Sequence, residues 1–363
     1  MFANILDISW FYQGMEDFKK TVIRNFIVKI ISVICIFIFI KKPSDLTKYM
    51  YIYVISTLFG SLTLWVGIWK YIEKPKKLKF IYHIPLTIAL FIPQIAIQVY
   101  TVLDKTMIGS ILHDMNEVGY YEQAQKIVKI LLTIITAIGT VMMPRIANCF
   151  AEGNTEQIKI YMRKTFNFVL ILAFPLMFGL ITISENFVPL FLGQGYDKVS
   201  LLMSILSFII VFISLSSIIG NQYLLSIKKQ KEYTISVVVG ALINFILNFI
   251  LINNYKSVGA AIATVIAELS VTLIQFYFVR KEFKLMDIIK MSKNYVFAGL
   301  VMFAICMLID QVVLSNFVGI VLQVCAGILV YFGILLIIKD KYLYELLNQG
   351  KNITKSKLNK NEN

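Results

Sequence analysis

Residues 201–225 read LLMSILSFIIVFISLSSIIGNQYLL, a segment without a single charged side chain. At about 1.5 Å per residue, an α-helix of this length crosses the roughly 30 Å hydrocarbon core of a bilayer. Backbone polar groups find no water in lipid, so a helix, which bonds its own backbone, is the form expected there. The segment therefore predicts a membrane-spanning helix.

The rest of the chain repeats this pattern. Of its 363 residues 58% are hydrophobic and only 15% are charged, and the mean hydropathy is +0.76. Such a composition excludes a soluble globular domain. We predict an all-α bundle of about ten spans: Thr21–Ile40, Tyr49–Trp69, Phe80–Leu103, Ile127–Met143, Phe166–Phe191, Leu201–Leu225, Tyr233–Ile252, Val258–Phe278, Tyr295–Ile309 and Val313–Ile338.

The net charge of +14 is distributed in a regular way. Most of the 35 Lys and Arg residues fall in every second connection between spans and in the tail from Lys339 to Lys360, although the connection with Lys41, Lys42 and Lys48 departs from this pattern. Positively charged connections stay on the cytoplasmic side of a membrane. The charge therefore indicates topology rather than nucleic-acid binding, and it predicts a multi-pass protein with a cytoplasmic C-terminus.

Few residues have the chemistry of a metal or catalytic site. The four cysteines, His83 and His113 are scattered, without the spacing of a disulfide framework or a metal-ligand set. No connection exceeds roughly two dozen residues, too few for a folded domain outside the membrane. The polar residues 349–363 are typical of a disordered tail. We expect no metal, no cofactor and no enzymatic domain.

Polar residues inside the spans are costly in lipid and tend to face a bundle interior or a water-filled cavity. In the fourth span they recur at steps of three and four, which puts them on one helix face. Shorter stripes occur in three other spans, and we interpret the four stripes as the lining of a shared cavity. Their members are Glu122, Lys126, Lys129, Thr133, Thr136 and Thr140 in the fourth span; Thr21, Asn25, Lys29 and Ser32 in the first; Gln94, Gln98, Thr101 and Lys105, beside Asp104, in the third; and Ser236, Gly240, Asn244 and Asn248 in the seventh.

Two interpretations stay open for several of these residues. Lys126 lies near a predicted helix end, where a long side chain can reach the interface, whereas Lys29 lies about two turns inside its span and is expected in a cavity. Asn244 and Asn248 can instead bond neighbouring helices. Glu268, in the middle of the eighth span, is either a proton or cation site or a buried carboxylic acid paired with a neighbour.

Several motifs resemble a known family. Residues 7–19, DISWFYQGMEDFK, closely resemble the DISWFFQGLEDFK motif of bacterial oligosaccharide flippases, with conservative departures at Tyr12 and Met15. These flippases are the polysaccharide transporter branch of the multidrug/oligosaccharidyl-lipid/polysaccharide exporter superfamily. Further similar stretches are VLDKTMIG (102–109), VGYYEQAQK (118–126), VMMPR (141–145), GNQYLL (220–225) and GAAIATVIAE (259–268).

The resemblance implies twelve to fourteen helices in two six-helix lobes, with an optional terminal pair, around a central cavity. Met1–Tyr12 then resembles the end of an earlier span, so we expect a partial span followed by ten complete ones and a first lobe that is incomplete. The expected division is residues 1–77 for the rest of the first lobe, 78–290 for the second lobe, 291–348 for the terminal pair and 349–363 for a cytoplasmic tail. With part of one cavity wall missing, this chain alone is expected to transport poorly.

The resemblance also implies a cargo, an oligosaccharide on a polyprenyl diphosphate, in the bacterial cytoplasmic membrane. A diphosphate requires cations in a low-dielectric cavity, which Lys29, Lys105, Lys126 and Lys129 supply, while Asn25, Gln98 and Thr133 bond sugar hydroxyls. Asp104 and Glu268 are candidate coupling groups for alternating access. Expected partners are membrane lipids and, beyond the cargo, a polysaccharide polymerase and assembly proteins.

Two other functions are compatible with parts of this sequence. A cation-coupled drug exporter of the same superfamily would share the fold, but the cationic stripes favour an anionic cargo. A membrane-embedded glycan polymerase would be an enzyme, and we would expect a long external connection with clustered carboxylates or Arg and His, which this sequence lacks.

Overall fold

The computed structural model describes residues 5–71, 80–312 and 316–348, and every regular element in these ranges is a helix. Eight helical segments within them are long and apolar enough to cross a membrane, which confirms the predicted all-α membrane bundle. The elements are α2 (Ser9–Gly14), α3 (Phe18–Phe39), η1 (Pro43–Asp45), α4 (Leu46–Thr63), η2 (Ile68–Lys70), α5 (Phe80–Leu112), α6 (Met115–Ala151), α7 (Thr155–Leu192), α8 (Asp197–Leu206), α9 (Ile209–Ser217), η3 (Ile218–Leu224), α10 (Gln230–Phe278), α11 (Leu285–Val312) and α12 (Asn316–Ile337).

The difference between eight segments and ten predicted spans has a structural reason. α10 contains one non-helical residue, Lys256, with φ 53° and ψ −135°. On either side of it the two arms fold back on each other, so that Gln275 Nε2 donates to Ser236 Oγ at 3.2 Å. α10 is therefore a hairpin of two antiparallel helices and holds two predicted spans, while α5 covers the range of the third predicted span.

The turn of this hairpin is held by a buried carboxylate. Glu117, in the first turn of α6, is only 5% exposed. It accepts hydrogen bonds from Ser257 Oγ at 2.5 Å and from Lys198 Nζ, just inside α8, at 2.6 and 2.7 Å. A buried carboxylate requires such partners. The Glu117 cluster therefore joins the start of α6, the start of α8 and the turn of the α10 hairpin at one end of the bundle.

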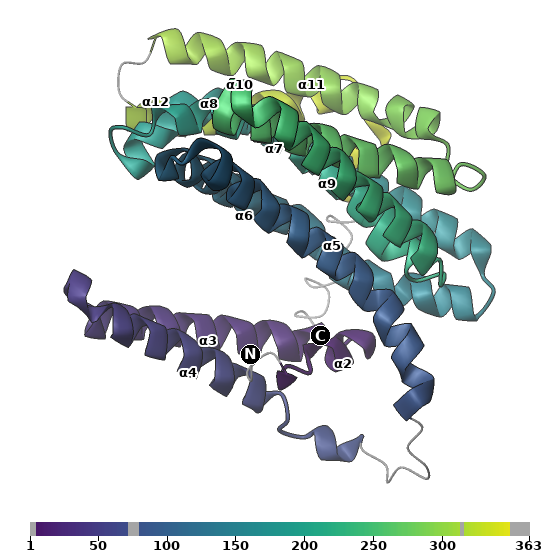
Figure 1. Ribbon diagram of the computed structural model, residues 1–363. Helices are drawn as coiled ribbons and strands as arrows, with labels where there is room; N and C mark the ends of the chain where they lie inside the picture. Colours follow the sequence, from purple (N-terminus) through teal and green to yellow (C-terminus); the bar gives the residue numbers. More distant parts are fainter. Residues whose placement is uncertain (1–4, 72–79, 313–315, 349–363) are drawn as a thin grey trace, which may run out of the picture.

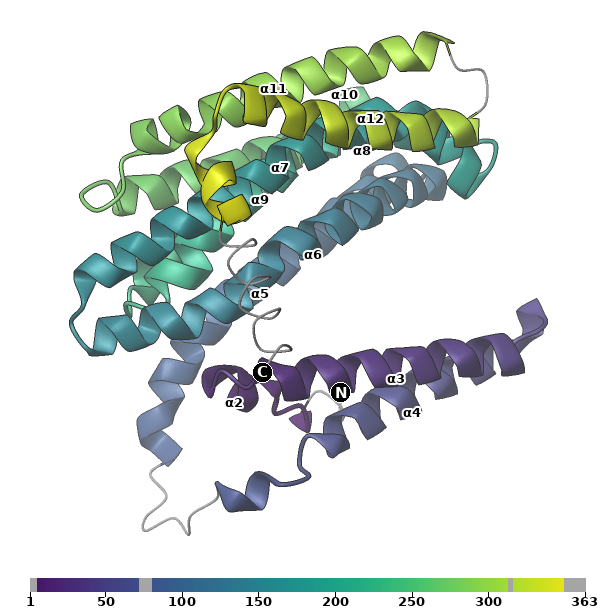
Figure 2. The same cartoon turned by 180° about the vertical axis from the view of Figure 1, so that it is seen from behind.

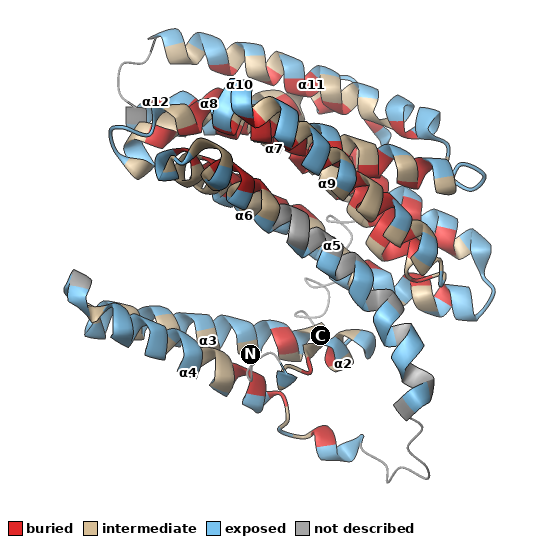
Figure 3. Cartoon of the chain, in the orientation of Figure 1, coloured by how far each residue is buried: buried red, intermediate tan, exposed pale blue. Residues whose placement is uncertain are grey.

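The helices form two groups (Figures 1 and 2). α3 and α4 make a separate pair, and α5 to α12 make a larger bundle in which α5 and α6 lie on the side that faces the pair. Buried residues are concentrated in the larger bundle, whereas most of α3 and α4 is exposed (Figure 3). The exposed apolar side chains, such as Phe26 and Phe37 on α3, are those expected of a lipid-facing surface.

The DISWFYQGMEDFK segment closes the end of the α3–α4 pair. The Tyr12 hydroxyl donates to the Leu64 carbonyl at 2.7 Å, and Nζ of Lys20, the residue directly after the segment, donates to the Val66 carbonyl at 2.9 Å. Both carbonyls follow α4, where helical partners run out. The predicted partial span over Met1–Tyr12 is not one helix in its described part: the backbone leaves the helix at Leu6 and re-enters it at Ser9. At this break Asp7 accepts from the Ser9 amide at 2.7 Å.

The last two long helices, α11 and α12, pack against α7 and against each other. At one end Asp310 accepts from Asn186 and, at 3.0 Å, from Gln323 Nε2. In the middle, the buried Tyr331 hydroxyl donates to the Ile171 carbonyl at 3.0 Å. The pair is therefore fixed to the bundle by polar contacts as well as by packing.

Candidate functional site

The most completely buried acidic side chain in the described chain is Asp104 of α5, which is 0% exposed. The Tyr121 hydroxyl donates to its Oδ2 at 2.7 Å, Asn248 Nδ2 donates to its Oδ1 at 2.6 Å, and the Thr264 hydroxyl donates at 3.1 Å. Asp104 forms no ion pair with any described residue. Its partners come from α6 and from both arms of the α10 hairpin, so one carboxyl group joins four helix segments.

The side chains that donate to Asp104 are all neutral, and none of them is a cation. Desolvation disfavours a buried charge unless an opposite charge or several hydrogen bonds compensate it. Nearby amide atoms remain without a described partner, namely Asn248 Oδ1 and Asn244 Nδ2. The arrangement can hold a proton on Asp104, or a small cation among the Asp, Asn and Thr oxygens.

A cavity of about 440 Å³ opens beside this network. Lys129 and Thr133 of α6 line it together with Asp104 and with Glu268 of α10. Glu268 is only 5% exposed. The structure thus brings two predicted cargo-binding residues and both predicted coupling residues to one cavity.

One wall of the cavity is the π-helix η3, which the GNQYLL motif forms. Asn221 lines the cavity, and Gln222 is buried behind it. Gly220 has no room for a side chain, because a Cβ there would lie 2.6 Å from a ring carbon of Tyr233 and 2.8 Å from Gln275 Nε2. Single π turns inside helices are frequent at functional sites. This one lies where Tyr233 and Gln275, one from each arm of α10, approach Gly220.

The ammonium groups of Lys105 and Lys126 both lie close to the carboxylate of Glu122. Lys126 Nζ is 3.1 Å from a Glu122 carboxylate oxygen, and Lys105 Nζ is 3.5 Å from the same oxygen. The Lys126 side chain is 60% exposed. The α6 stripe, which we define as Glu122, Lys126, Lys129, Thr133, Thr136 and Thr140, therefore runs from this cluster into the cavity and along the exposed side of α6.

The remaining predicted site residues are not brought to this cavity. Gln98 lies on an exposed part of α5. Asn25 and Lys29 are exposed on α3, which lies apart from α6 in both views (Figures 1 and 2). The seventh-span stripe is also absent from an open cavity: Ser236, Asn244 and Asn248 are 0% exposed. Ser236 bonds Gln275 of the other α10 arm and Asn248 bonds Asp104 of α5, while Asn244 accepts from Asn248 within its own arm.

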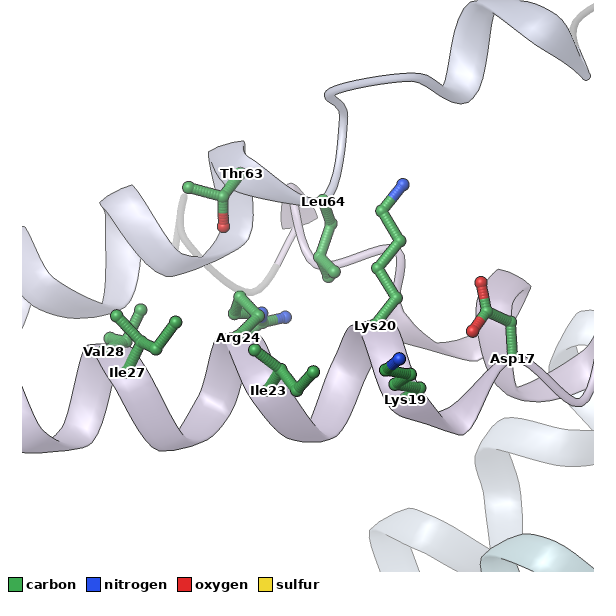
Figure 4. A pocket seen from close by; sticks show the side chains of 9 residues that line it. All are labelled: Asp17, Lys19, Lys20, Ile23, Arg24, Ile27, Val28, Thr63 and Leu64. Carbon is green, nitrogen blue, oxygen red and sulfur yellow. The ribbon is translucent and has the colours of Figure 1, made fainter. Parts of the chain in front are cut away.

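The α3–α4 pair has a cavity of its own, of about 520 Å³. Lys20 and Arg24 lie along it and Leu64 closes one side (Figure 4). Arg24 pairs with Asp7 at 3.4 Å, and its Nε has no described partner. The lining of this cavity extends along α3 to Val28, next to Lys29, and shares no residue with the cavity at Asp104.

Two family models match the chain. Residues 1–150 match the model described as "Polysaccharide biosynthesis protein", and residues 89–250 match MatE. Together the two matches span residues 1–250 and support the resemblance to the multidrug/oligosaccharidyl-lipid/polysaccharide exporter superfamily. With its apolar helices, the chain is a multi-pass membrane protein.

Curated relatives of this chain include transporters and flippases. A putative O-antigen transporter of Escherichia coli (strain K12) is 23% identical over 290 residues, which are 77% of this chain and 68% of the relative. Lipid II flippase MurJ of Bacillus subtilis (strain 168) is 28% identical over 211 residues, 57% of this chain and 36% of the relative. The probable low-salt glycan biosynthesis flippase Agl15 of Haloferax volcanii is 26% identical over 168 residues, 46% of this chain and 35% of the relative.

A solved structure titled "Lipid II flippase MurJ, inward closed conformation" has the same fold, with a TM-score of 0.63 and 24% sequence identity. The match covers 82% of this chain and 64% of the solved one. The chain thus spans about two thirds of the length of that structure.

Sequence reasoning missed several residues of this site. Tyr121 and Thr264 complete the shell of Asp104, and their hydroxyl oxygens are 2.9 Å apart although 143 positions separate them. Glu117 and Lys198, which hold the turn of the α10 hairpin, were not predicted either. Helical periodicity identifies the face of one helix, but it does not say which distant helix that face meets.

Proposed function

We propose that this protein is a flippase that moves a polyprenyl-diphosphate-linked oligosaccharide from the cytoplasmic to the outer leaflet of a bacterial cytoplasmic membrane. The cargo then passes to the enzymes that build cell-surface polysaccharide. Relatives named as an O-antigen transporter and a lipid II flippase support a lipid-linked glycan as cargo. The basic connections support an orientation with the C-terminus in the cytoplasm.

The α6 stripe is the observation that carries the proposal. Lys126 and Thr133 are exposed on α6, a helix on the side of the bundle that faces α3 and α4 (Figure 1), and Lys129 lines the cavity. Ammonium groups bind the oxygens of a diphosphate through charge-assisted hydrogen bonds. Threonine hydroxyls both donate and accept, as sugar hydroxyls require. The lipid chain stays among the exposed apolar side chains.

Transport by this arrangement requires the two helix groups to rock against each other. The groups touch where Glu16, after α2, accepts from Asn148 Nδ2 of α6 at 3.5 Å and lies 3.6 Å from Arg145 Nε. The three side chains are exposed or nearly so. Exposed ion pairs of this kind contribute little free energy, so this contact can open and close.

Asp104 and Glu268 are the groups through which we expect transport to be coupled to an ion gradient. Both are buried beside the cavity that Lys129 enters. Binding of a proton or a small cation at Asp104 changes the charge next to the cargo site. Replacing Asp104 with Asn keeps the shape but fixes that charge, and we expect it to abolish the dependence of transport on the gradient.

A drug exporter of the same superfamily is the alternative with the same fold. MatE similarity over residues 89–250 is compatible with it. The α6 stripe carries two exposed or half-exposed lysines, which repel the cationic compounds that such exporters often carry. Charge therefore favours the anionic glycan lipid.

A binding measurement tests the proposal. The purified chain in lipid nanodiscs is titrated with a short-chain polyprenyl diphosphate that carries a disaccharide, and then with the corresponding monophosphate. The double variant Lys126→Gln/Lys129→Gln is expected to bind the diphosphate at least about 10-fold more weakly, because each charge-assisted contact contributes roughly 1.5–3 kcal/mol.

The matched control is Lys159→Gln/Lys231→Gln, which removes the same charge from exposed positions elsewhere and should bind like the unmodified chain. If both double variants lost the same affinity for the diphosphate, the loss would reflect the net charge of the chain and not a site on the α6 stripe. If the unmodified chain bound a cationic drug tightly and did not bind the diphosphate, the drug exporter would be favoured instead.

A further inference from the structure

We propose that the chain binds the phosphate of an anionic phospholipid in a pocket between α7, α11 and the segment that follows α12. This basic pocket, which we define by Arg163, Lys164, Lys290, Lys339 and Lys341, surrounds a cavity of about 640 Å³. It shares no residue with the cavity at Asp104, and the inference does not depend on the proposed cargo.

Three of the basic segments that the sequence analysis assigned to the cytoplasmic side converge here. Arg163 and Lys164 come from the start of α7, Lys290 from the start of α11, and Lys339 and Lys341 from the segment after α12. Their like charges repel one another unless an anion lies between them. None of the five forms an ion pair with a residue in the described ranges, whereas other lysines, such as Lys159 and Lys198, do.

The acidic residues of the pocket do not neutralise it. Asp340 is 8% exposed, and its carboxylate accepts from Asn294 Nδ2 and from the Leu343 amide, both at 3.1 Å. Its role is to fix the backbone after α12. Glu345 also lines the cavity but is exposed. Five cations against two carboxylates leave the pocket strongly positive.

The position of the pocket distinguishes a membrane lipid from a soluble phosphate. Its inner end is formed by Asn167 and the buried Tyr295, whose hydroxyl donates to Asn167 Oδ1 at 3.4 Å. Directly beside the cations, large apolar side chains are exposed: Ile160 is 47% exposed, Ile337 80% and Ile338 39%. The cations therefore lie where apolar helices end, at head-group height, and basic pockets between helices on the cytoplasmic side are suited to anionic head groups.

The experiment uses the full chain in mild detergent with phosphatidylglycerol or phosphatidylcholine added, and native mass spectrometry counts the lipids retained. We expect selective retention of phosphatidylglycerol. The variant Arg163→Gln/Lys290→Gln should bind it about 10-fold or more weakly, because it loses two charge-assisted contacts. The control Lys228→Gln/Lys231→Gln removes two charges from another basic connection and should bind like the unmodified chain.

Two further arms identify the ligand and guard against misfolding. Inorganic phosphate at millimolar concentration should not displace the lipid, and displacement would assign the pocket to a soluble phosphate. Glu345→Gln removes a repelling carboxylate and should bind phosphatidylglycerol about 1.5- to 5-fold more tightly, the range of one exposed charge pair. Equal binding by the Arg163/Lys290 and Lys228/Lys231 variants, or no gain with Glu345→Gln, would overturn the proposal.

Discussion

At the scale of single residues, the hydroxyl of Tyr121 is the most informative group in the bundle. It donates to the Asp104 carboxyl at 2.7 Å in a region with no solvent access to either side chain. Removing it leaves a buried carboxyl oxygen with one donor fewer, and hydrogen bonds to such groups contribute roughly 1.5–3 kcal/mol. Tyr121→Phe should therefore lower the thermal unfolding temperature in detergent by several degrees.

Tyr120→Phe is the matched control, because the Tyr120 hydroxyl has no described hydrogen bond and its ring meets Tyr196 edge to face at 6.0 Å. This substitution should leave the unfolding temperature almost unchanged. Identical effects of the two substitutions would show that the Asp104 network contributes nothing to stability.

A second prediction at this scale concerns pH. Burial alone would raise the pKa of Asp7, but hydrogen bonds from Ser9 and the charge of Arg24 outweigh it and hold the pKa below its usual 3.8. A carboxyl whose folded pKa is lowered stabilises the protein above its unfolded pKa and loses that effect as pH falls through the folded pKa. Asp7→Asn should thus destabilise the chain equally at pH 6 and pH 8, and progressively less as the pH falls below 3.8.

Unfolding temperatures across this pH range check the prediction. Asp17→Asn, at an exposed residue without a side-chain cap bond, is the control and should change little at any of these values. A difference between Asp7→Asn and the unmodified chain that grows as pH falls would contradict the sign of the shift.

Residue-scale prediction from the sequence reached only part of the site. Asp104 and Glu268 were identifiable because a carboxyl group inside an apolar span is costly and so indicates a role. Asn248 was expected to bond a neighbouring helix, and it bonds Asp104. Thr264 and Tyr121 were not identified as partners, because their contacts depend on how α10 folds back, and no local pattern encodes that packing.

At the scale of elements, the α10 hairpin depends on close approach of its arms. A Cβ on Gly259 would collide with the Leu251 carbonyl, a backbone group that has little freedom to move. Gly259→Ala should destabilise the chain by about 1–3 kcal/mol. Gly333→Ala in α12, where no atom lies within 4 Å of the added Cβ, should be neutral or stabilising by up to about 1 kcal/mol.

Thermal unfolding of the two variants in the same detergent compares them directly. Equal stability of Gly259→Ala and Gly333→Ala would mean that the arms are not in contact. The sequence predicted the two spans of this hairpin and a break between them, but it did not place the break at Lys256, because a non-glycine residue with positive φ has no reliable sequence signal.

At the scale of the whole molecule, the contact of Glu16 with Arg145 and Asn148 joins the two helix groups. The sequence predicted two groups through the family resemblance alone, since hydropathy finds spans but not how they associate. If the groups rock during transport, this contact must break. With Glu16→Cys and Asn148→Cys, a short thiol cross-linker should join the groups in membranes, and the yield should fall when a diphosphate-linked glycan is added.

The control pair is Glu156→Cys/Lys159→Cys, on one turn of α7, where the native side chains are 2.8 Å apart. Its cross-linking yield should not respond to the glycan. An unchanged yield for the Glu16/Asn148 pair as well would argue against rocking at this contact.

The most direct test of the central claim is to locate the cargo on the α6 stripe by photo-cross-linking. A photoreactive amino acid replaces Thr133, and separately Ile337, an exposed apolar residue of α12, in cells that make radiolabelled lipid-linked oligosaccharide. We expect Thr133 to capture the labelled glycan and Ile337 to capture little of it. Equal capture at both positions, or capture at Ile337 alone, would contradict a cargo path along α6.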